Sequence, residues 1–270
     1  TVSSDNWSYR MTQELPALCE LCGGTGFVIV ERDGATRARS CRCRDRGARP
    51  RGASLLLDAA RVPSRYVECE FENFDELPED ALALAQAKAS AKRYAEEYPL
   101  GDIGLLLMGP PGVGKTHLAV AILRYLAIEK GVPCLFFDVQ DLLRQLQATF
   151  DRQSGMTQLD LMQPVLQTEM VVLDDLGGRL CTPWVEETLA HIVTTRYNER
   201  RATIVTTNFL DGPEEIKSPT LIDRIGRRVR SRLHEMCRLV TVKAGDYRSK
   251  VKLADHHRLA TRPGPRKETA

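Results

Sequence analysis

Residues 103–116 read IGLLLMGPPGVGKT, and this stretch decides the fold. An apolar run of strand length passes into a glycine-rich loop, and an amphipathic helix pattern follows. The loop at 109–116 matches G-x-x-x-x-G-K-[ST] at every fixed position, in the strand–loop–helix context that a phosphate-binding loop needs. Its glycines let backbone N–H groups turn toward phosphate oxygens, and the helix N-terminus adds a positive dipole. The stretch therefore predicts a P-loop.

The P-loop supplies the first candidate ligands of a nucleotide. Lys115 is expected to reach the β- and γ-phosphates, and the Thr116 hydroxyl is expected to ligate Mg²⁺. We expect ATP and Mg²⁺ as the bound species. The predicted nucleotide-binding residues of the loop are Gly109, Pro110, Pro111, Gly112, Val113, Gly114, Lys115, Thr116 and His117.

Outward from the P-loop, apolar strand patterns alternate with helix patterns. Strands are expected at 103–108, 132–138, 170–175, 202–208 and 238–242, and helices at 80–98, 116–131, 139–150 and 184–200. Near-continuous apolar strands separated by helices predict a parallel sheet covered on both faces. The predicted fold class is α/β.

Polar residues follow two of these strands. Asp174 and Asp175 come at the carboxyl end of MVVLDD, and Asn208 follows Thr207 at the end of TIVTTN. Open α/β sheets bind ligands at the carboxyl ends of their strands. Asp174 is expected to hold Mg²⁺, directly or through water, and Asp175 to position and polarise the attacking water. Asn208 is expected to orient that water against the γ-phosphate.

Composition narrows the class of protein. The chain has 270 residues, 43% of them hydrophobic, and 38 Lys and Arg against 36 Asp and Glu. This is enough for one sizeable core and a small extra module. No apolar run reaches the ~18 residues of a membrane span, and no secretory signal is visible. Eight cysteines in such a chain indicate cytosolic thiols or metal ligands. We expect a cytoplasmic protein without a membrane partner.

Four motifs together resemble one family. GPPGVGKTH, VVLDDLG, RYNERRATIVTTN and RIGRRVRSRL are similar to the AAA+ ATPases of the DnaC/DnaI helicase-loader and IstB transposition-helper group. RVPSRYVECEFENF resembles that group's lead-in to the ATPase core, so the resemblance covers roughly residues 62–248. It implies a nucleotide-binding core of the ASCE type and self-association with ATP at the subunit interfaces. It also implies action on a replicative hexameric helicase or on DNA.

The resemblance assigns roles to arginines. Five arginines lie between positions 224 and 232. By the family pattern, Arg232 is the first candidate for an arginine finger that completes a neighbour's site, and Arg228 is the alternative. Arg248 resembles the family's sensor-II arginine, which acts in its own subunit's site. A solvent-facing helix surface is the plain alternative for this cluster.

Two departures from the wider AAA+ pattern matter. Asp175 stands where Glu is commoner, one methylene shorter, which predicts a slow, switch-like ATPase. The polar tail after the last strand is too short for a helical lid domain, so we expect a lidless core. In this branch the region corresponding to 149–168 carries a helical insertion associated with single-stranded DNA. Here Arg152 is its one basic residue, and phosphate contacts are expected instead from Arg144, Arg179 or the 224–232 cluster.

Four cysteines near the N-terminus form a metal-ligand pattern. In CELCGGTGFVIVERDGATRARSCRC two cysteine pairs flank a strand, a turn at Asp33 and Gly34, and a return strand. Four thiolates suit tetrahedral Zn²⁺, and so small a module needs a metal to fold. A zinc-ribbon-like module is predicted, with a helicase-docking role by resemblance; the seven arginines at 37–51 leave nucleic-acid contact as the rival role. The predicted zinc ligands are Cys19, Cys22, Cys41 and Cys43.

The predicted organisation has four parts. Residues 1–50 form the zinc module, 51–72 a linker, 73–248 the AAA+ ATPase domain, and 249–270 a flexible basic tail. The remaining cysteines, which lie in apolar contexts, are expected to be core residues: Cys69, Cys134, Cys181 and Cys237.

The hypothesis favoured by these features is an ATP-dependent loader that delivers a replicative helicase onto single-stranded DNA. A transposition helper that remodels target DNA is the close alternative, and the cysteine module favours the loader. A small-molecule kinase would need an acceptor-binding lid, and nothing in 141–168 resembles one. A non-hydrolysing adaptor remains open because of Asp175.

Overall fold

The structure is a computed structural model that describes residues 27–32, 35–40, 51–99, 103–150, 157–212 and 219–249, with side chains from residue 55 onward. Its centre is a five-stranded sheet in the order β4-β5-β6-β3-β7, with every neighbouring pair parallel. The strands are β3 (Gly104–Met108), β4 (Cys134–Asp138), β5 (Met170–Asp174), β6 (Thr203–Thr207) and β7 (Cys237–Thr241). The predicted α/β fold with a parallel sheet is confirmed.

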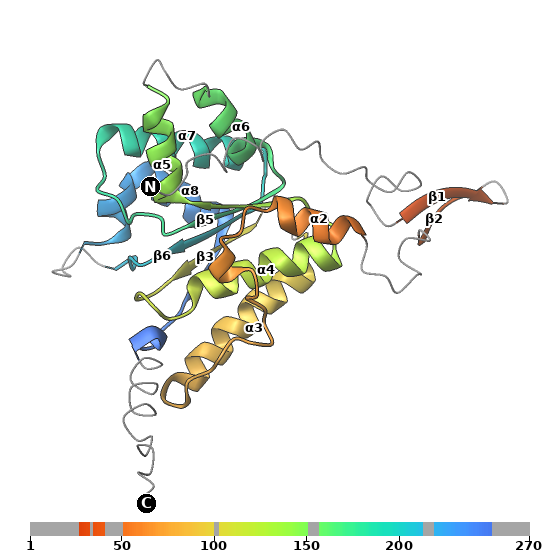
Figure 1. Cartoon of the computed structure of the whole chain (residues 1–270), viewed down its shortest axis with the longest axis horizontal. Helices are drawn as coiled ribbons and strands as arrows, with labels where there is room; N and C mark the ends of the chain where they lie inside the picture. The colour runs from red at the N-terminus through yellow and green to blue at the C-terminus, as the bar shows by residue number, and fades with distance from the viewer. Residues whose placement is uncertain are drawn as a thin grey trace, which may run out of the picture.

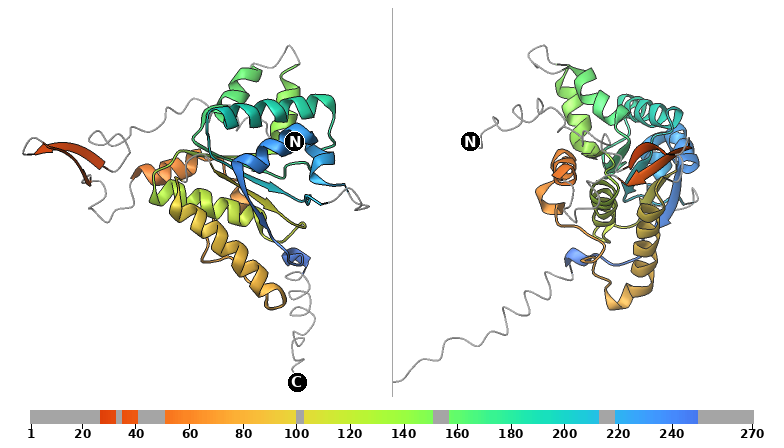
Figure 2. Two further views of the ribbon diagram at one scale, coloured as in Figure 1. Left: turned by 180° about the vertical axis from the view of Figure 1, so that it is seen from behind. Right: turned by 90° about the vertical axis from the view of Figure 1, so that its right-hand side faces the viewer.

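Helices cover both faces of this sheet (Figures 1 and 2). On one face lie α2 (Arg51–Ala59), α3 (Ala81–Glu97) and α4 (Lys115–Glu129), around a core that includes Leu105 and Leu107. On the other face lie α5 (Val139–Ala148), α6 (Gln158–Gln167), α7 (Pro183–Asn198) and α8 (Leu221–Met236), around Leu106 and Met108. The period-two alternation of β3 thus supplies both cores, as expected for a strand buried on both faces.

Strand register brings the predicted polar residues to one edge. Met108 of β3 pairs with Thr207 of β6, and Asp138 of β4 pairs with Asp174 of β5. The P-loop follows β3 directly, so its loop and these strand ends share the carboxyl edge of the sheet. That edge carries the candidate site.

Residues 51–80, most of them expected as linker, pack onto the α/β body. After α2 come two short 3₁₀ helices, η3 (Ser64–Tyr66) and η4 (Pro78–Asp80). Ala60 and Phe71 are buried in the core, and Ala60 O accepts a hydrogen bond from Phe136 N of β4 at 2.8 Å. The α2 region therefore covers the β4 edge of the sheet.

A buried arginine ties α7 to α6 and to the start of β6. The Arg196 side chain is fully buried. Its Nε donates to Thr203 Oγ1 at 2.8 Å, and its terminal nitrogens donate to Val165 O at 2.8 Å, Thr168 O at 2.9 Å and Ala202 O at 2.6 Å. A guanidinium so far from water is tolerated because its donors are satisfied.

Two antiparallel strands near the N-terminus match the predicted strand and return strand. The antiparallel strands β1 (Phe27–Arg32) and β2 (Ala35–Ser40) pair from Phe27–Ser40 to Arg32–Ala35. The predicted zinc ligands lie outside the described residues: Cys19, Cys22, Cys41 and Cys43. The same holds for most of the predicted tail at 249–270 and for Arg152 of the expected insertion, whose described part is α6.

Two further expectations bear on the described residues. Cys134 and Cys237 are buried as predicted, whereas Cys69 and Cys181 are half-buried, and all four are free thiols. Within the part of the chain that the structure describes, no helix is long and apolar enough to cross a bilayer.

Candidate nucleotide site

The P-loop runs from the end of β3 to the first residue of α4 and has the backbone that its glycines allow. Gly112 has φ +80° and Gly114 has φ +93°, a region that side chains rarely adopt. A Cβ on Gly112 would lie 1.8 Å from Asp246 Oδ1, and one on Gly114 would lie 2.5 Å from the Phe74 ring. Both positions thus require glycine for conformation and for space.

Lys115 lies at the start of α4 with its ammonium group held by three acceptors. Its Nζ donates to Gly109 O at 2.8 Å, to Pro110 O at 2.7 Å and to Asn208 Oδ1 at 2.7 Å. The side chain is 6% exposed, and this burial lowers the pKa of Lys115 to about 8, against the opposing effect of the nearby Asp174 and Asp175. The loop carbonyls therefore fix a buried cation beside the strand ends.

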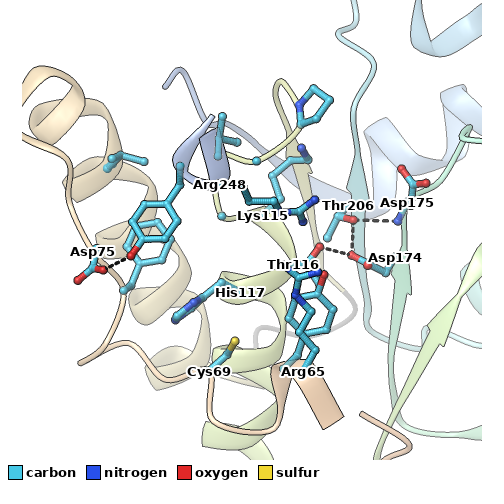
Figure 3. A pocket seen from close by; sticks show the side chains of 18 of the residues that line it. Arg65, Cys69, Asp75, Lys115, Thr116, His117, Asp174, Asp175, Thr206 and Arg248 are labelled. Carbon is cyan, nitrogen blue, oxygen red and sulfur yellow. Dashed lines mark hydrogen bonds between the residues drawn. The ribbon is translucent and has the colours of Figure 1, made fainter. Parts of the chain in front are cut away.

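Thr116, Asp174 and Thr206 form a hydrogen-bonded group of oxygens. Thr116 Oγ1 donates to Asp174 Oδ1 at 2.9 Å, and Thr206 Oγ1 donates to the same oxygen at 2.6 Å. Burial raises the pKa of Asp174, and the two hydroxyl bonds oppose that shift. Figure 3 shows these three side chains converging.

This donor set fits Mg²⁺, which prefers oxygen ligands and usually takes one or two carboxylates together with substrate phosphates and water. No group of three or more His, Cys, Asp or Glu that could hold a metal occurs within the described ranges. A site of Thr116 and Asp174 would therefore depend on the nucleotide for further ligands.

Asp175 is held by amides on two sides. Its φ is +56°, an unusual conformation for a residue other than glycine. Asn208 Nδ2 donates to Asp175 Oδ1 at 2.7 Å, and Gln140 Nε2 donates to Asp175 Oδ2 at 2.6 Å. Asp175 N also donates to Thr206 Oγ1 at 3.0 Å. Asn208 thus bridges Lys115 and Asp175, the P-loop cation and the second acid.

These groups line one cavity of about 780 Å³. Residues 111–117 of the P-loop and α4 line it together with Asp174, Asp175 and Asn208. Arg248 also lines it (Figure 3), at the end of a short segment whose Tyr247 N donates to Gly112 O at 3.2 Å. Cations, acids and loop amides therefore face a common space large enough for a nucleotide.

Not every predicted residue lines the cavity. Gly109 and Pro110 contribute carbonyls to Lys115 and are not among the lining residues. Arg228 and Arg232 lie on α8 and do not line the cavity. His117 does line it, with its ring edge-on to Phe74 and its Nε2 2.8 Å from Glu70 O.

Several residues of the site were not foreseen from sequence. Thr206 lines the cavity and bonds both acids. Gln140 bonds Asp175 from outside the lining, and one wall of the cavity comes from the segment before α3. Alternation along β6 places Thr206 and Thr207 on opposite faces of the sheet. The sequence does not say which of the two faces the site. No periodic signal identifies the wall formed by Arg65, Tyr66, Glu68, Cys69, Asn73, Phe74, Asp75 and Leu77.

The fold and the site define a P-loop nucleotide-binding protein of the α/β class. The family described as "IstB-like ATP binding protein" matches residues 95–255. The chain belongs to this family of AAA+ proteins, and ATP binding is its common property.

Three relatives place the chain within the family. The replicative helicase loader DnaC of Buchnera aphidicola subsp. Schizaphis graminum is 29% identical over 172 residues, covering 63% of this chain and 68% of the relative. The replicative helicase loader DnaC of Escherichia coli K12 is 25% identical over 202 residues, covering 74% of this chain and 79% of the relative. A crystal structure of the DnaC helicase loader is 32% identical with a TM-score of 0.58, covering 67% of this chain and all of that one.

Proposed function

We propose that this chain is an ATP-dependent loader of a replicative DNA helicase, acting as an oligomer switched by ATP. One observation carries the proposal. The cavity unites a P-loop lysine, two strand-end acids and a sensing amide, while the arginines of α8 lie outside it. One chain thus supplies the groups that would bind ATP and activate water, but its α8 arginines do not reach its own cavity. An arginine from a second copy of the chain would complete the site. The named relatives that span most of the chain are helicase loaders, and this favours the loader over the transposition helper.

The roles proposed for the site residues follow from their contacts. Lys115 would face the β- and γ-phosphates, and the P-loop amides and Arg248 would bind the remaining phosphate charge. Thr116 and Asp174 would hold Mg²⁺, which supplies positive charge beside the phosphates. Asp175 would position and polarise a water, and Asn208 would orient it. The shorter Asp175 supports slow, switch-like hydrolysis.

The partners of the α8 arginines support a finger at Arg228 or Arg232. Arg230 is paired with Asp211, and Arg224 lies over the Phe209 ring at 4.5 Å. Arg228 is exposed, and the half-buried Arg232 donates from Nη1 to Arg228 O at 3.4 Å, a long bond at the surface. Both are therefore suited to reach a neighbouring copy, with Arg232 as our first choice.

An aromatic pair, of which Phe150 is exposed and Trp184 is half-buried, supports contact with single-stranded DNA. Phe150 is 61% exposed, and its ring meets that of Trp184 edge-on at 6.0 Å. Bases stack on such side chains with little dependence on sequence. Arg179 lies close by, bonded to Gln147 Oε1 at 2.8 Å, and Arg144 lies on α5. These arginines would contact phosphates.

The N-terminal module is proposed as a zinc-bound docking domain for the helicase. The β1–β2 hairpin supports a zinc ribbon because its strands join the two cysteine pairs. The proposed ligands are Cys19, Cys22, Cys41 and Cys43. Contact of this module with nucleic acid, through the arginines at 37–51, is the rival role. The proposed boundaries stay at 1–50, 51–72, 73–248 and 249–270, with 51–72 a connecting segment that packs into the core of the ATPase domain.

Two experiments test the proposal. The full chain should co-purify with the replicative helicase of its host when ATP is present; no complex at micromolar concentrations would contradict the loader role. The composite site is tested by mixing Arg232→Ala with Asp175→Asn in the presence of single-stranded DNA. Each variant should be nearly inactive alone. Loss of a trans arginine costs about 10³-fold or more, and Asp175→Asn loses the carboxylate that would polarise the water. The mixture should regain activity, because some interfaces pair an intact Arg232 with an intact Asp175. If no activity returns for Arg232→Ala or for Arg228→Ala, the shared site is wrong.

A further inference from the structure

Helix α8 is two helical segments joined at a kink. Gly226 has φ 77° and ψ 159°, values outside the helical region, between the residues of the first turn and those of 227–236. A capping box of Thr220 and Asp223 holds the start of the first segment, with Thr220 N donating to Asp223 Oδ2 at 2.7 Å. Because the kink interrupts the helix, this cap does not set the rotation of the second segment.

The second segment carries charged residues on two opposite sides. At 3.6 residues per turn, successive side chains are about 100° apart. Arg228 and Arg232 therefore lie on one side, and Arg230 and His234 lie about 200° away. The buried stripe of Val229, Leu233 and Met236 separates the two sides. A rotation that displaces one side displaces the other by the same angle.

Asp211 binds the side of the second segment that carries Arg230 and His234. Arg230 Nε donates to Asp211 Oδ1 at 2.6 Å and Arg230 Nη2 donates to Asp211 Oδ2 at 2.5 Å, a bidentate pair. His234 Nε2 lies 2.6 Å from the same Oδ2. The Asp211 side chain is 10% exposed, and its bonds to Arg230 hold the pKa of this carboxyl below its usual range. Bidentate pairing fixes orientation as well as distance.

Asp211 belongs to the same short segment as Asn208. Along this segment Phe209 lies under the Arg224 guanidinium, and Leu210 O accepts from Leu221 N at 3.1 Å. At its start Asn208 bonds Lys115 and Asp175. Residues 208–211 thus connect the nucleotide cavity to both segments of α8.

We propose that Asp211 is a positioning residue that sets the rotation of the second segment of α8 and so presents Arg228 and Arg232 to the nucleotide site of a second copy of the chain. This inference rests on the shared site proposed above. Asp211 acts through Arg230 and His234 and does not line the nucleotide cavity. Its loss should therefore damage a subunit as a donor of the finger while leaving that subunit's own site intact.

The test variant is Asp211→Ala in the full chain. Its ATP affinity should stay within about threefold of the parent, because Lys115, Thr116 and the loop amides are unchanged. DNA-stimulated hydrolysis should fall about 10²-fold, since a misplacement of about 1 Å can cost that much. The matched control is Tyr197→Phe, which removes a 2.5 Å bond from α7 to Glu235 of α8 without touching residues 208–211. The control should keep its activity.

Mixing separates positioning from general damage. Asp211→Ala should be rescued by Asp175→Asn, which has a defective site and intact arginines. It should not be rescued by the double variant Arg228→Ala/Arg232→Ala, which has the same kind of defect. Rescue in the reverse pattern, or parental activity of Asp211→Ala alone, would overturn the inference.

Two controls keep the result interpretable. Mixing Asp175→Asn with the double arginine variant must restore activity; if it does not, the shared site fails rather than the role of Asp211. Should Asp211→Ala fold poorly, Arg230→Lys replaces it, because lysine keeps the charge and cannot form the bidentate pair. If Arg230→Lys is rescued by neither partner, or is fully active, the inference is wrong.

Discussion

Replacing Asn208 by alanine should separate hydrolysis from ATP binding. Asn208 makes two bonds to charged partners, accepting from Lys115 Nζ and donating to Asp175 Oδ1, both at 2.7 Å. Lys115 would keep its bonds to Gly109 O and Pro110 O. Asp175 would keep only the Gln140 amide on its carboxylate. The Asp175 carboxylate therefore loses one of its two hydrogen bonds, and the Lys115 ammonium loses one of its three.

The magnitudes follow from these contacts. ATP affinity should change less than threefold, or about 0.7 kcal/mol. Hydrolysis at saturating ATP should fall about 10²-fold, because Asp175 loses one of the two amides that orient it. The free energy of unfolding should fall by about 1 to 3 kcal/mol, as expected for partly buried bonds to charged groups.

The assay combines titration of a fluorescent ATP analogue with single-turnover hydrolysis on single-stranded DNA. Gln140→Ala is the matched control, because it removes the other amide on Asp175 and leaves Lys115 untouched. Both variants should lower the turnover rate and spare affinity. A tenfold loss of ATP affinity in Asn208→Ala with an unchanged hydrolysis rate would refute this account. It would mean that Asn208 acts only by holding Lys115 and not by orienting Asp175.

Three further predictions concern pH, metal and stability. Because burial lowers the pKa of Lys115 to about 8, ATP affinity should decline as pH rises through about 8. The Lys115→Ala variant should stay folded and bind ATP poorly, and its affinity should not show this pH dependence. The folded chain binds fewer protons at Lys115 than the unfolded chain between about pH 8 and the normal lysine pKa, so this group alone makes stability rise with pH there. Elemental analysis should find about one Zn²⁺ per chain, lost in Cys22→Ser; a disulfide among the four N-terminal cysteines of freshly isolated protein would contradict it. Arg196→Met should lower the free energy of unfolding by about 3 kcal/mol or more in denaturant titrations. Two buried carbonyls and one partly buried carbonyl lose donors, at about 1 kcal/mol or more each. Arg201→Met should cost less than about 1 kcal/mol, because Arg201 is 31% exposed and its partners Glu199 and Gln167 O lie at the surface. Equal losses in the two variants would refute the role of burial.

The sequence by itself determined the sheet and the centre of the site. The P-loop is one contiguous stretch, so its residue types and spacing predict both its backbone conformation and the phosphate that it binds. The apolar strand patterns are local as well, and they correctly predicted β3 to β7 and the strand ends that carry Asp174, Asp175 and Asn208. Parallel strands bring their carboxyl ends to one edge, which is why these distant residues could be expected to meet.

Only the tertiary structure decided which other side chains meet them. Gln140 reaches Asp175 because β4 and β5 are neighbours in the strand order, and nothing in the helix pattern of α5 signals that contact. Among the residues expected as linker, Phe71 is buried in the core and Cys69 lines the nucleotide cavity. The pairing of Asp211 with Arg230 depends on the kink at Gly226 and on the rotation of α8. Such contacts depend on strand order, helix rotation and chain path, which are set by packing of the whole core rather than by any local stretch of sequence.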